Sequence, residues 1–294
     1  MRYQDLPDRD AHGFFGDKDA LGSLNKQTPA AIAAAASLIV SGELFSLNAP
    51  LNWPDPPLFS RKPVQHTVFQ TPLGNRDDYL DSFYPQASTQ WDGFTHFRDP
   101  EVGFYNHLPP EELGIDVWAR KGIAGRAVLL DFARHCERHG KEFDWLSRAS
   151  ITVEDLEAVR LEAGVEQRSG DILLVRTGWM RAYNSATPEE KAQVHKTLIG
   201  PGIDPSDEMA EYLWDWGVSA FANDTFGFEP MPPGPDTLHA RILARLGIPI
   251  GELWDLEALA AHSAADGRYE SFVTSAPLNI PGGVGSPANA LAIK

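Results

Sequence analysis

The chain has 294 residues, 43% of them hydrophobic, which is enough apolar material for a sizeable buried core and excludes a disordered protein. Its 41 acidic residues outnumber its 25 basic residues, and the formal net charge of −16 repels phosphate backbones and anionic lipid, so we expect a small-molecule partner and neither nucleic acid nor membrane. Cys136 is the only cysteine, which excludes an intramolecular disulfide and a zinc site built from several cysteines.

The N-terminal part of the chain predicts few regular elements. Residues 1–19 are acidic and lack the apolar run of a signal peptide, so we expect a cytoplasmic protein. Thr28 followed by Pro29 is typical of a helix start, and this helix is predicted to run through residues 30–41 and to end at Gly42. Strands are predicted on either side of a proline-rich irregular loop, at residues 43–47 and 65–70 around residues 51–63.

Strands and helices alternate in the rest of the chain. Continuous apolar runs predict buried strands within residues 125–132, 169–179 and 218–224. Helices are predicted at residues 151–164, 206–217 and 235–247. Thr152, with Asp155 three residues later, is close to a capping box at the start of the first of these helices. This alternation indicates an α/β fold, and the even composition favours a single domain over residues 1–294.

The run STQWDGFTHF, residues 88–97, places protonatable groups among large aromatic residues. If residues 88–92 form a strand, Gln90 and Asp92 point to the same face, and His96 follows just after a turn. Oxygen and nitrogen ligands of this kind suit a divalent cation. A core hydrogen bond between the aspartate and the histidine is the alternative interpretation.

Three further polar residues lie in predicted buried surroundings. His239 is on the apolar face of the helix predicted at residues 235–247, and Glu252 follows the apolar run 248–251 with no basic residue nearby in the sequence. Asp224 ends a predicted strand, where α/β proteins place functional groups. Each residue has an alternative interpretation in which its role is only structural. His239 is then a hydrogen-bonded core histidine, Glu252 caps a helix, and Asp224 is a turn or helix-capping residue.

Together these residues resemble the cyclase family, also called kynurenine formamidase-like metal hydrolases, which includes isatin hydrolases. The family motif H-x-G-T-H-x-D-x-P-x-H corresponds to QASTQWDGFTH, in which Thr89, Asp92 and His96 match and glutamine replaces histidine at Gln86 and Gln90. The stretches GIAGRAVLLDF, GDILLVRTGW, LWDWGVSAFANDTFGFE and SAPLNIPGGVGSPANALAIK extend the resemblance over most of the chain. The sequence is similar to a branch of the family in which S-x-Q-W-D-G replaces the histidine-rich form.

The resemblance implies a swivelling β/β/α fold with mixed sheets and packed helices, and hydrolysis of a cyclic or aryl amide, lactam or lactone. It implies Asp92, His239 and Glu252 as metal ligands, with Gln90 as a further ligand, and His96 as the general acid/base toward a metal-bound water. Because glutamine is a weaker, neutral ligand, we expect one Mn²⁺ or Zn²⁺ ion, with loss of the metal as the alternative. Family members form dimers or tetramers, so a homodimer or homotetramer is expected.

Trp91 and Phe94 are expected to line the substrate pocket, and Asp224 is expected to be a further substrate-binding residue. A lyase or cyclase acting through an enolate at the same site is an alternative function, and so is a non-catalytic binding protein on this fold. The sequence leaves the substrate open. It also leaves open the roles of His66, His107, Arg126 and Arg176, of which the two arginines either bind a substrate carboxylate or pair with acids.

Overall fold

The computed structural model describes all residues, 1–294, and is built around a nine-stranded mixed sheet. In spatial order its strands are β1 (Leu44–Ser46), β13 (Ala290–Ile293), β11 (Glu270–Ser275), β5 (Ile123–Asp131), β7 (Ile172–Arg176), β9 (Ala220–Asn223), β10 (Ile250–Glu252), β4 (Gln90–Asp92) and β12 (Gly285–Pro287). The central strands β5, β7, β9 and β10 are parallel, and the strands on both sides of them pair antiparallel. The α/β class with a mixed sheet is confirmed.

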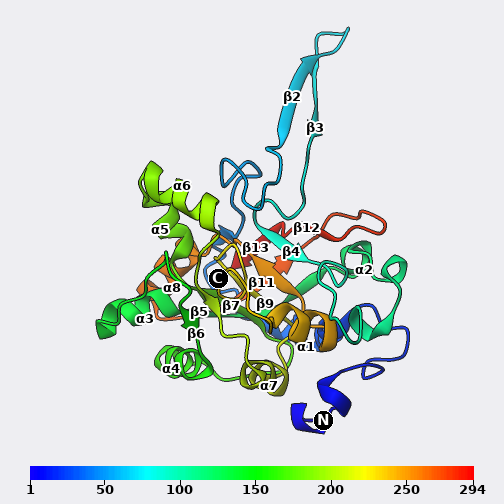
Figure 1. Ribbon diagram of the computed structural model, residues 1–294, viewed down its shortest axis with the longest axis vertical. Helices are drawn as coiled ribbons and strands as arrows, with labels where there is room; N and C mark the ends of the chain where they lie inside the picture. The colour runs from blue at the N-terminus through cyan, green and yellow to red at the C-terminus, as the bar shows by residue number, and fades with distance from the viewer.

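Helices surround this sheet (Figure 1). The α-helices are α1 (Pro29–Ala36), α2 (Asp116–Lys121), α3 (Phe132–His139), α4 (Val153–Ala163), α5 (Trp179–Ser185), α6 (Pro188–Thr197), α7 (Asp207–Trp216) and α8 (Glu257–Asp266). Short 3₁₀ helices are η1 (Tyr3–Asp5), η2 (Pro7–Arg9), η3 (Gly22–Lys26), η4 (Tyr105–His107) and η5 (Pro110–Glu112). Helices α1 and α4 pack on β5, and α3 packs on β7. No helix combines the length and the apolar character that crossing a bilayer requires.

Two small sheets lie outside the main one. Strands β2 (Gln65–Gln70) and β3 (Arg76–Asp81) form a hairpin that projects from the body of the molecule (Figure 1), and every residue of both strands is exposed. Strands β6 (Ser150–Ile151) and β8 (Gly202–Ile203) form a short parallel pair. The strand predicted at residues 65–70 is confirmed. Its partner β3 is not predicted by the sequence, because charged and exposed residues hide the strand pattern.

The central strands behave as their apolar runs predict. Residues of β7 and β9 are buried along their whole length, as expected for parallel strands covered on both faces. Helix α4 begins with a complete capping box between Thr152 and Asp155, as predicted. Helix α1, however, ends at Ala36 and not at residue 41. Farther along, the backbone N–H groups of Ser41 and Gly42 donate to the carbonyl of Lys294, so this part of the predicted helix pairs with the C-terminus instead.

The segment predicted as an α-helix at residues 235–247 is a π-helix, η6 (His239–Arg245), and it begins later than predicted. Its wide turn is visible where the N–H of Leu246 donates to the carbonyl of Arg241, five residues back. The hydrophobic pattern predicts the helical segment but not its hydrogen-bond period, because α and π turns bury similar faces. π-helical turns often occur at functional sites.

Candidate active site

Strands β4 and β10 bring two of the predicted ligands face to face. Their antiparallel register pairs Gln90 with Glu252 and Asp92 with Ile250. The Gln90 amide Nε2 donates to Glu252 Oε2 at 2.8 Å and to Asp92 Oδ1 at 3.3 Å. Gln90 and Asp92 therefore share one face of β4, as the alternation of side chains along a strand predicts.

The π-helix η6 adds His239 to this group. Its Nε2 atom lies 3.7 Å from Asp92 Oδ2 and 3.6 Å from Glu252 Oε1. Its Nδ1 atom lies 2.7 Å from Oε2 of Glu229. The backbone N–H of Phe228 donates to Glu252 Oε1 at 2.8 Å and holds that carboxylate in place. One imidazole is thus surrounded by three buried carboxylates.

His96 lies at the outer side of the group. Its Nε2 atom is 3.7 Å from Asp92 Oδ1. The His96 side chain is 28% exposed, whereas the Asp92 and His239 side chains are 0% and 10% exposed. The structure therefore brings together His96, Asp92, His239, Glu252 and Gln90, and solvent reaches this group at His96.

The unpaired atoms of the site fit a cation. Asp92 Oδ2 and Gln90 Oε1 are buried and accept no hydrogen bond. The separations of 3.6–3.7 Å from His239 to the two carboxylates are too long for hydrogen bonds. Ligand atoms that share one ion at about 2.1 Å lie roughly 3–3.6 Å apart, so these separations are close to those of a common ion. The residues present therefore fit a metal ion.

The electrostatics of the site lead to the same conclusion. Burial, together with the charge of Asp92, raises the pKa of Glu252 well above its usual range. Burial would also raise the pKa of Asp92, but His96 and His239 outweigh that effect and hold this pKa below its usual value. Burial lowers the pKa of His239, yet Glu229, Asp92 and Glu252 together raise it well above normal. The site concentrates negative charge that a divalent cation would neutralise.

Arg61 brings a positive charge to the same site. It lies in the loop that precedes the hairpin, donates to the backbone carbonyl of Gln86 and stacks over Phe59. Burial lowers the pKa of its guanidinium, and the charges of Glu252 and Asp92 oppose that shift. Arg61 forms no ion pair, so its charge is available to a ligand.

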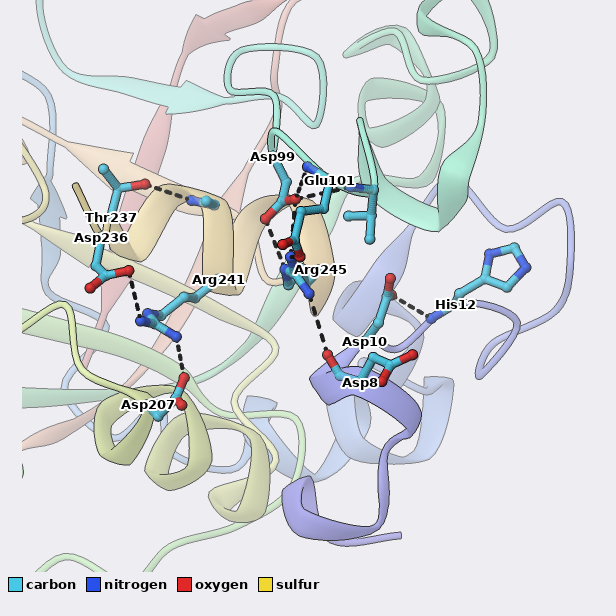
Figure 2. Close-up of polar contacts among 12 residues, drawn as sticks. Asp8, Asp10, His12, Asp99, Glu101, Asp207, Asp236, Thr237, Arg241 and Arg245 are labelled. Atoms are coloured by element: carbon cyan, nitrogen blue, oxygen red, sulfur yellow. Dashed lines mark hydrogen bonds and ion pairs between the residues drawn. The ribbon is translucent and has the colours of Figure 1, made fainter.

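A network of ion pairs fixes helix η6 relative to the segment that carries His96 (Figure 2). Arg245, at the end of η6, donates to both carboxylate oxygens of Asp99, at 2.8 and 3.1 Å, and Asp99 is three residues beyond His96. Arg241 pairs with Asp207 and with Asp236. Arg245 therefore ties the two histidine-bearing segments together.

The other predicted site residues lie elsewhere. Trp91 and Phe94 are fully buried: Trp91 donates from its indole to Ser275, and Phe94 packs on Tyr105. Both are part of the core and expose no surface to a ligand. Asp224 is also fully buried, and its carboxylate accepts hydrogen bonds at the start of α5, from the backbone and hydroxyl of Thr177 and the backbone of Gly178. None of its hydrogen bonds goes to the site.

The residues with open roles make local contacts. Arg126 pairs with Asp171 and Glu270, and Arg176 pairs with Asp131 and Glu257, so both arginines are engaged by acids. The two histidines also have carboxylate partners: His66 pairs with Asp78 within the hairpin, and His107 pairs with Asp10 and stacks on His12.

Two residues of the site have no role assigned from the sequence. Glu229 lies in the run FANDTFGFEP, which stands out as a candidate cluster together with Asp224, but the run does not indicate what Glu229 does. Arg61 lies in a proline-rich loop without regular periodicity and has no signal in the sequence. Tertiary packing brings Glu229 to His239, and it brings Arg61 close enough for its charge to act on Asp92 and Glu252.

The sequence matches the family model described as "Putative cyclase" over residues 45–230. A crystal structure of a novel cyclase is 33% identical, has a TM-score of 0.87, and covers 97% of this chain and 99% of its own. Isatin hydrolase A from Ralstonia solanacearum shares the fold, at 19% identity and a TM-score of 0.64 over 91% of this chain and 98% of its own. A predicted metal-dependent hydrolase from Bacillus stearothermophilus does so at 17% identity and a TM-score of 0.53, over 86% and 98%. No curated protein matches the sequence.

Proposed function

Because the chain belongs to the cyclase family, we propose that it is a metal-dependent hydrolase of a cyclic or aryl amide, lactam or lactone. The observation that carries this proposal is the buried group of Asp92, His239 and Glu252, with a carboxylate oxygen that accepts no hydrogen bond. The fold shared with isatin hydrolases, which by name act on a cyclic amide, supports the substrate class. The metal-dependent hydrolase of the same fold supports the cofactor.

Asp92, His239 and Glu252 would hold one divalent ion. Gln90, whose Nε2 group donates to Asp92 and Glu252, would add its Oε1 atom as a fourth donor once its amide group is turned over. Three oxygens and one imidazole are a ligand set suited to Mn²⁺ or Zn²⁺. When bound, such an ion polarises a substrate carbonyl and lowers the pKa of a water molecule. Glu229 orients His239 through its Nδ1 atom, so Nε2 would be free to bind the ion.

His96 is the residue placed for proton transfer. It is the solvent-accessible member of the group and lies 3.7 Å from the Asp92 carboxylate. In the proposed reaction water adds to the carbonyl carbon while His96 takes its proton. The C–N or C–O bond then breaks, His96 returns the proton to the leaving nitrogen or oxygen, and a carboxylate remains. Arg61 supplies positive charge for the developing oxyanion.

The first experiment is elemental analysis of the purified protein, followed by turnover of amides, lactams and lactones in ¹⁸O-labelled water. About one metal per chain, lost in Asp92→Asn, together with one label in the new carboxylate, supports a metal-dependent hydrolase. A product without the label contradicts hydrolysis and indicates a lyase or cyclase. A protein that takes up no Mn²⁺ or Zn²⁺ at all contradicts the metal site.

A further inference from the structure

Outside the candidate active site, two histidines of α3 lie beside a glutamate of α4. His135 and His139 are four residues apart, so they lie on the same helix face. The Nδ1 atom of His135 is 2.6 Å from Oε2 of Glu162, and the Nε2 atom of His139 is 3.3 Å from the same oxygen. Two imidazole nitrogens therefore converge on one carboxylate oxygen.

A small crevice lies beside two members of this cluster, His135 and Glu162. Its volume of about 20 Å³ holds one ion or water molecule. The residues that line it include Asp131, Arg134, His135, Arg138, Glu162 and Tyr269. The Asp131 side chain is buried and pairs with Arg176 through Oδ1 at 2.7 Å, and Arg134 Nε lies 3.5 Å from Oδ2. Its Oδ2 atom accepts no hydrogen bond, which is costly for a buried carboxylate.

The contacts between these side chains are hydrogen bonds or ion pairs, which a metal ion would replace. The two imidazole rings are 4.4 Å apart between centroids, so two protonated rings would repel each other. Arg138 already donates to Glu162 Oε1 at 2.6 Å and adds a further positive charge. Neutral imidazoles, in contrast, present nitrogen lone pairs, which are the form that binds a metal ion.

We propose that His135, His139 and Glu162 bind a divalent transition-metal ion, for which Zn²⁺ is the best match. Two imidazoles and one carboxylate are a recurring zinc ligand set, with a fourth position left for water. Hard ions such as Mg²⁺ prefer ligand sets made only of oxygen. Because the ligands come from α3 and α4, the ion links two neighbouring helices and stabilises the folded chain. This site is separate from the one that contains Asp92.

The test is a Zn²⁺ titration of the metal-free full-length protein by calorimetry, for the wild type and His139→Ala. The His139 side chain is 58% exposed, so its removal leaves no cavity. We expect His139→Ala to bind one zinc fewer per chain, or to bind that zinc at least about tenfold more weakly. The matched control is His66→Ala, an exposed histidine with a single carboxylate partner, which retains wild-type binding.

Two further variants distinguish this site from the active site and from a cluster of ion pairs without a metal. Asp92→Asn should retain the zinc that depends on His139, whatever it does at the active site. Arg138→Gln should tighten zinc binding, because it removes a cation that competes for Glu162. Zinc should also raise the melting temperature of the wild type more than that of His139→Ala. Equal zinc stoichiometry and affinity in the wild type and His139→Ala would overturn the proposal.

Discussion

The Nδ1 atom of His239 lies 2.7 Å from the Oε2 atom of Glu229, and both side chains are buried. Glu229 thereby accepts a hydrogen bond from Nδ1–H and leaves Nε2 turned toward Asp92 and Glu252. A histidine that ligates a metal is commonly held in this way by a carboxylate on its other nitrogen. The proposed centre thus has an outer carboxylate as well as its ligands.

Replacement of that outer carboxylate tests its contribution. Glu229→Gln keeps the shape of the side chain but removes the charge that stabilises the Nδ1–H of His239. We expect metal affinity to fall by about 10- to 100-fold, because the imidazole becomes a weaker and less oriented ligand. Competition with a chromophoric chelator measures the affinity. An unchanged affinity would show that Glu229 only fills space.

His96 is expected to act in proton transfer and not in metal binding. His96→Ala should lower kcat by roughly 10²–10⁴-fold while the metal content stays at the wild-type level. Asp92→Asn is the comparison variant, in which both metal content and turnover should fall. Elemental analysis and steady-state kinetics on the same preparation give both quantities. Full turnover by His96→Ala would remove this residue from the mechanism.

The Arg245–Asp99 pair is predicted to hold helix η6, which carries His239, in place against the segment that carries His96. Arg245→Gln leaves the buried Asp99 carboxylate without its bidentate partner and should lower the free energy of unfolding by about 2 kcal/mol. Because His96 is then less well placed, kcat should fall while the metal stays bound. Urea titration and kinetics measure these effects. Arg9→Gln is the control, since Arg9 lines the same surface cleft as Asp99 and Arg245 but forms no carboxylate pair. An equal effect of Arg9→Gln would contradict the prediction.

Asp224 is predicted to stabilise the fold and not to bind substrate. Its three accepted hydrogen bonds at the start of α5 predict that Asp224→Asn lowers the free energy of unfolding by about 2 kcal/mol. KM should stay unchanged, because none of these bonds involves the site. Thermal unfolding and kinetics distinguish the two roles. A rise in KM without a loss of stability would support substrate binding instead.

Lys26 should make stability depend on pH in the alkaline range. Burial, partly opposed by Asp215, lowers the pKa of Lys26 from 10.5 to about 8 in the folded chain, where the ammonium lies over Trp214. Between these two values the unfolded chain binds more protons, so the free energy of unfolding rises with pH relative to that of Lys26→Met. Urea titrations from pH 7 to 11 measure this difference. Lys18→Met, at an exposed position, should show no such trend, and parallel curves for wild type and Lys26→Met would contradict the prediction.

Elements with a strong local signal were predictable. The buried strands β5, β7 and β9 appear as continuous apolar runs, and α4 has its capping box. Strands β3, β11, β12 and β13 were not predicted. Strand β3 is charged and exposed, and β12 is a three-residue segment containing proline. The π-helical period of η6 was missed as well, because its apolar pattern also fits an α-helix. The homo-oligomeric state stays a prediction.

By itself the sequence determined the α/β class, the family and the residue types from which the site is made, because periodicity, caps and motifs are local properties of the chain. Only the tertiary structure decided which of those residues meet. Gln90 and Glu252 are 162 positions apart, and only the β4–β10 register places them opposite each other. Glu229 and Arg61 join the site, whereas Trp91 enters the core. Such contacts depend on long-range packing, which no local pattern in the sequence encodes.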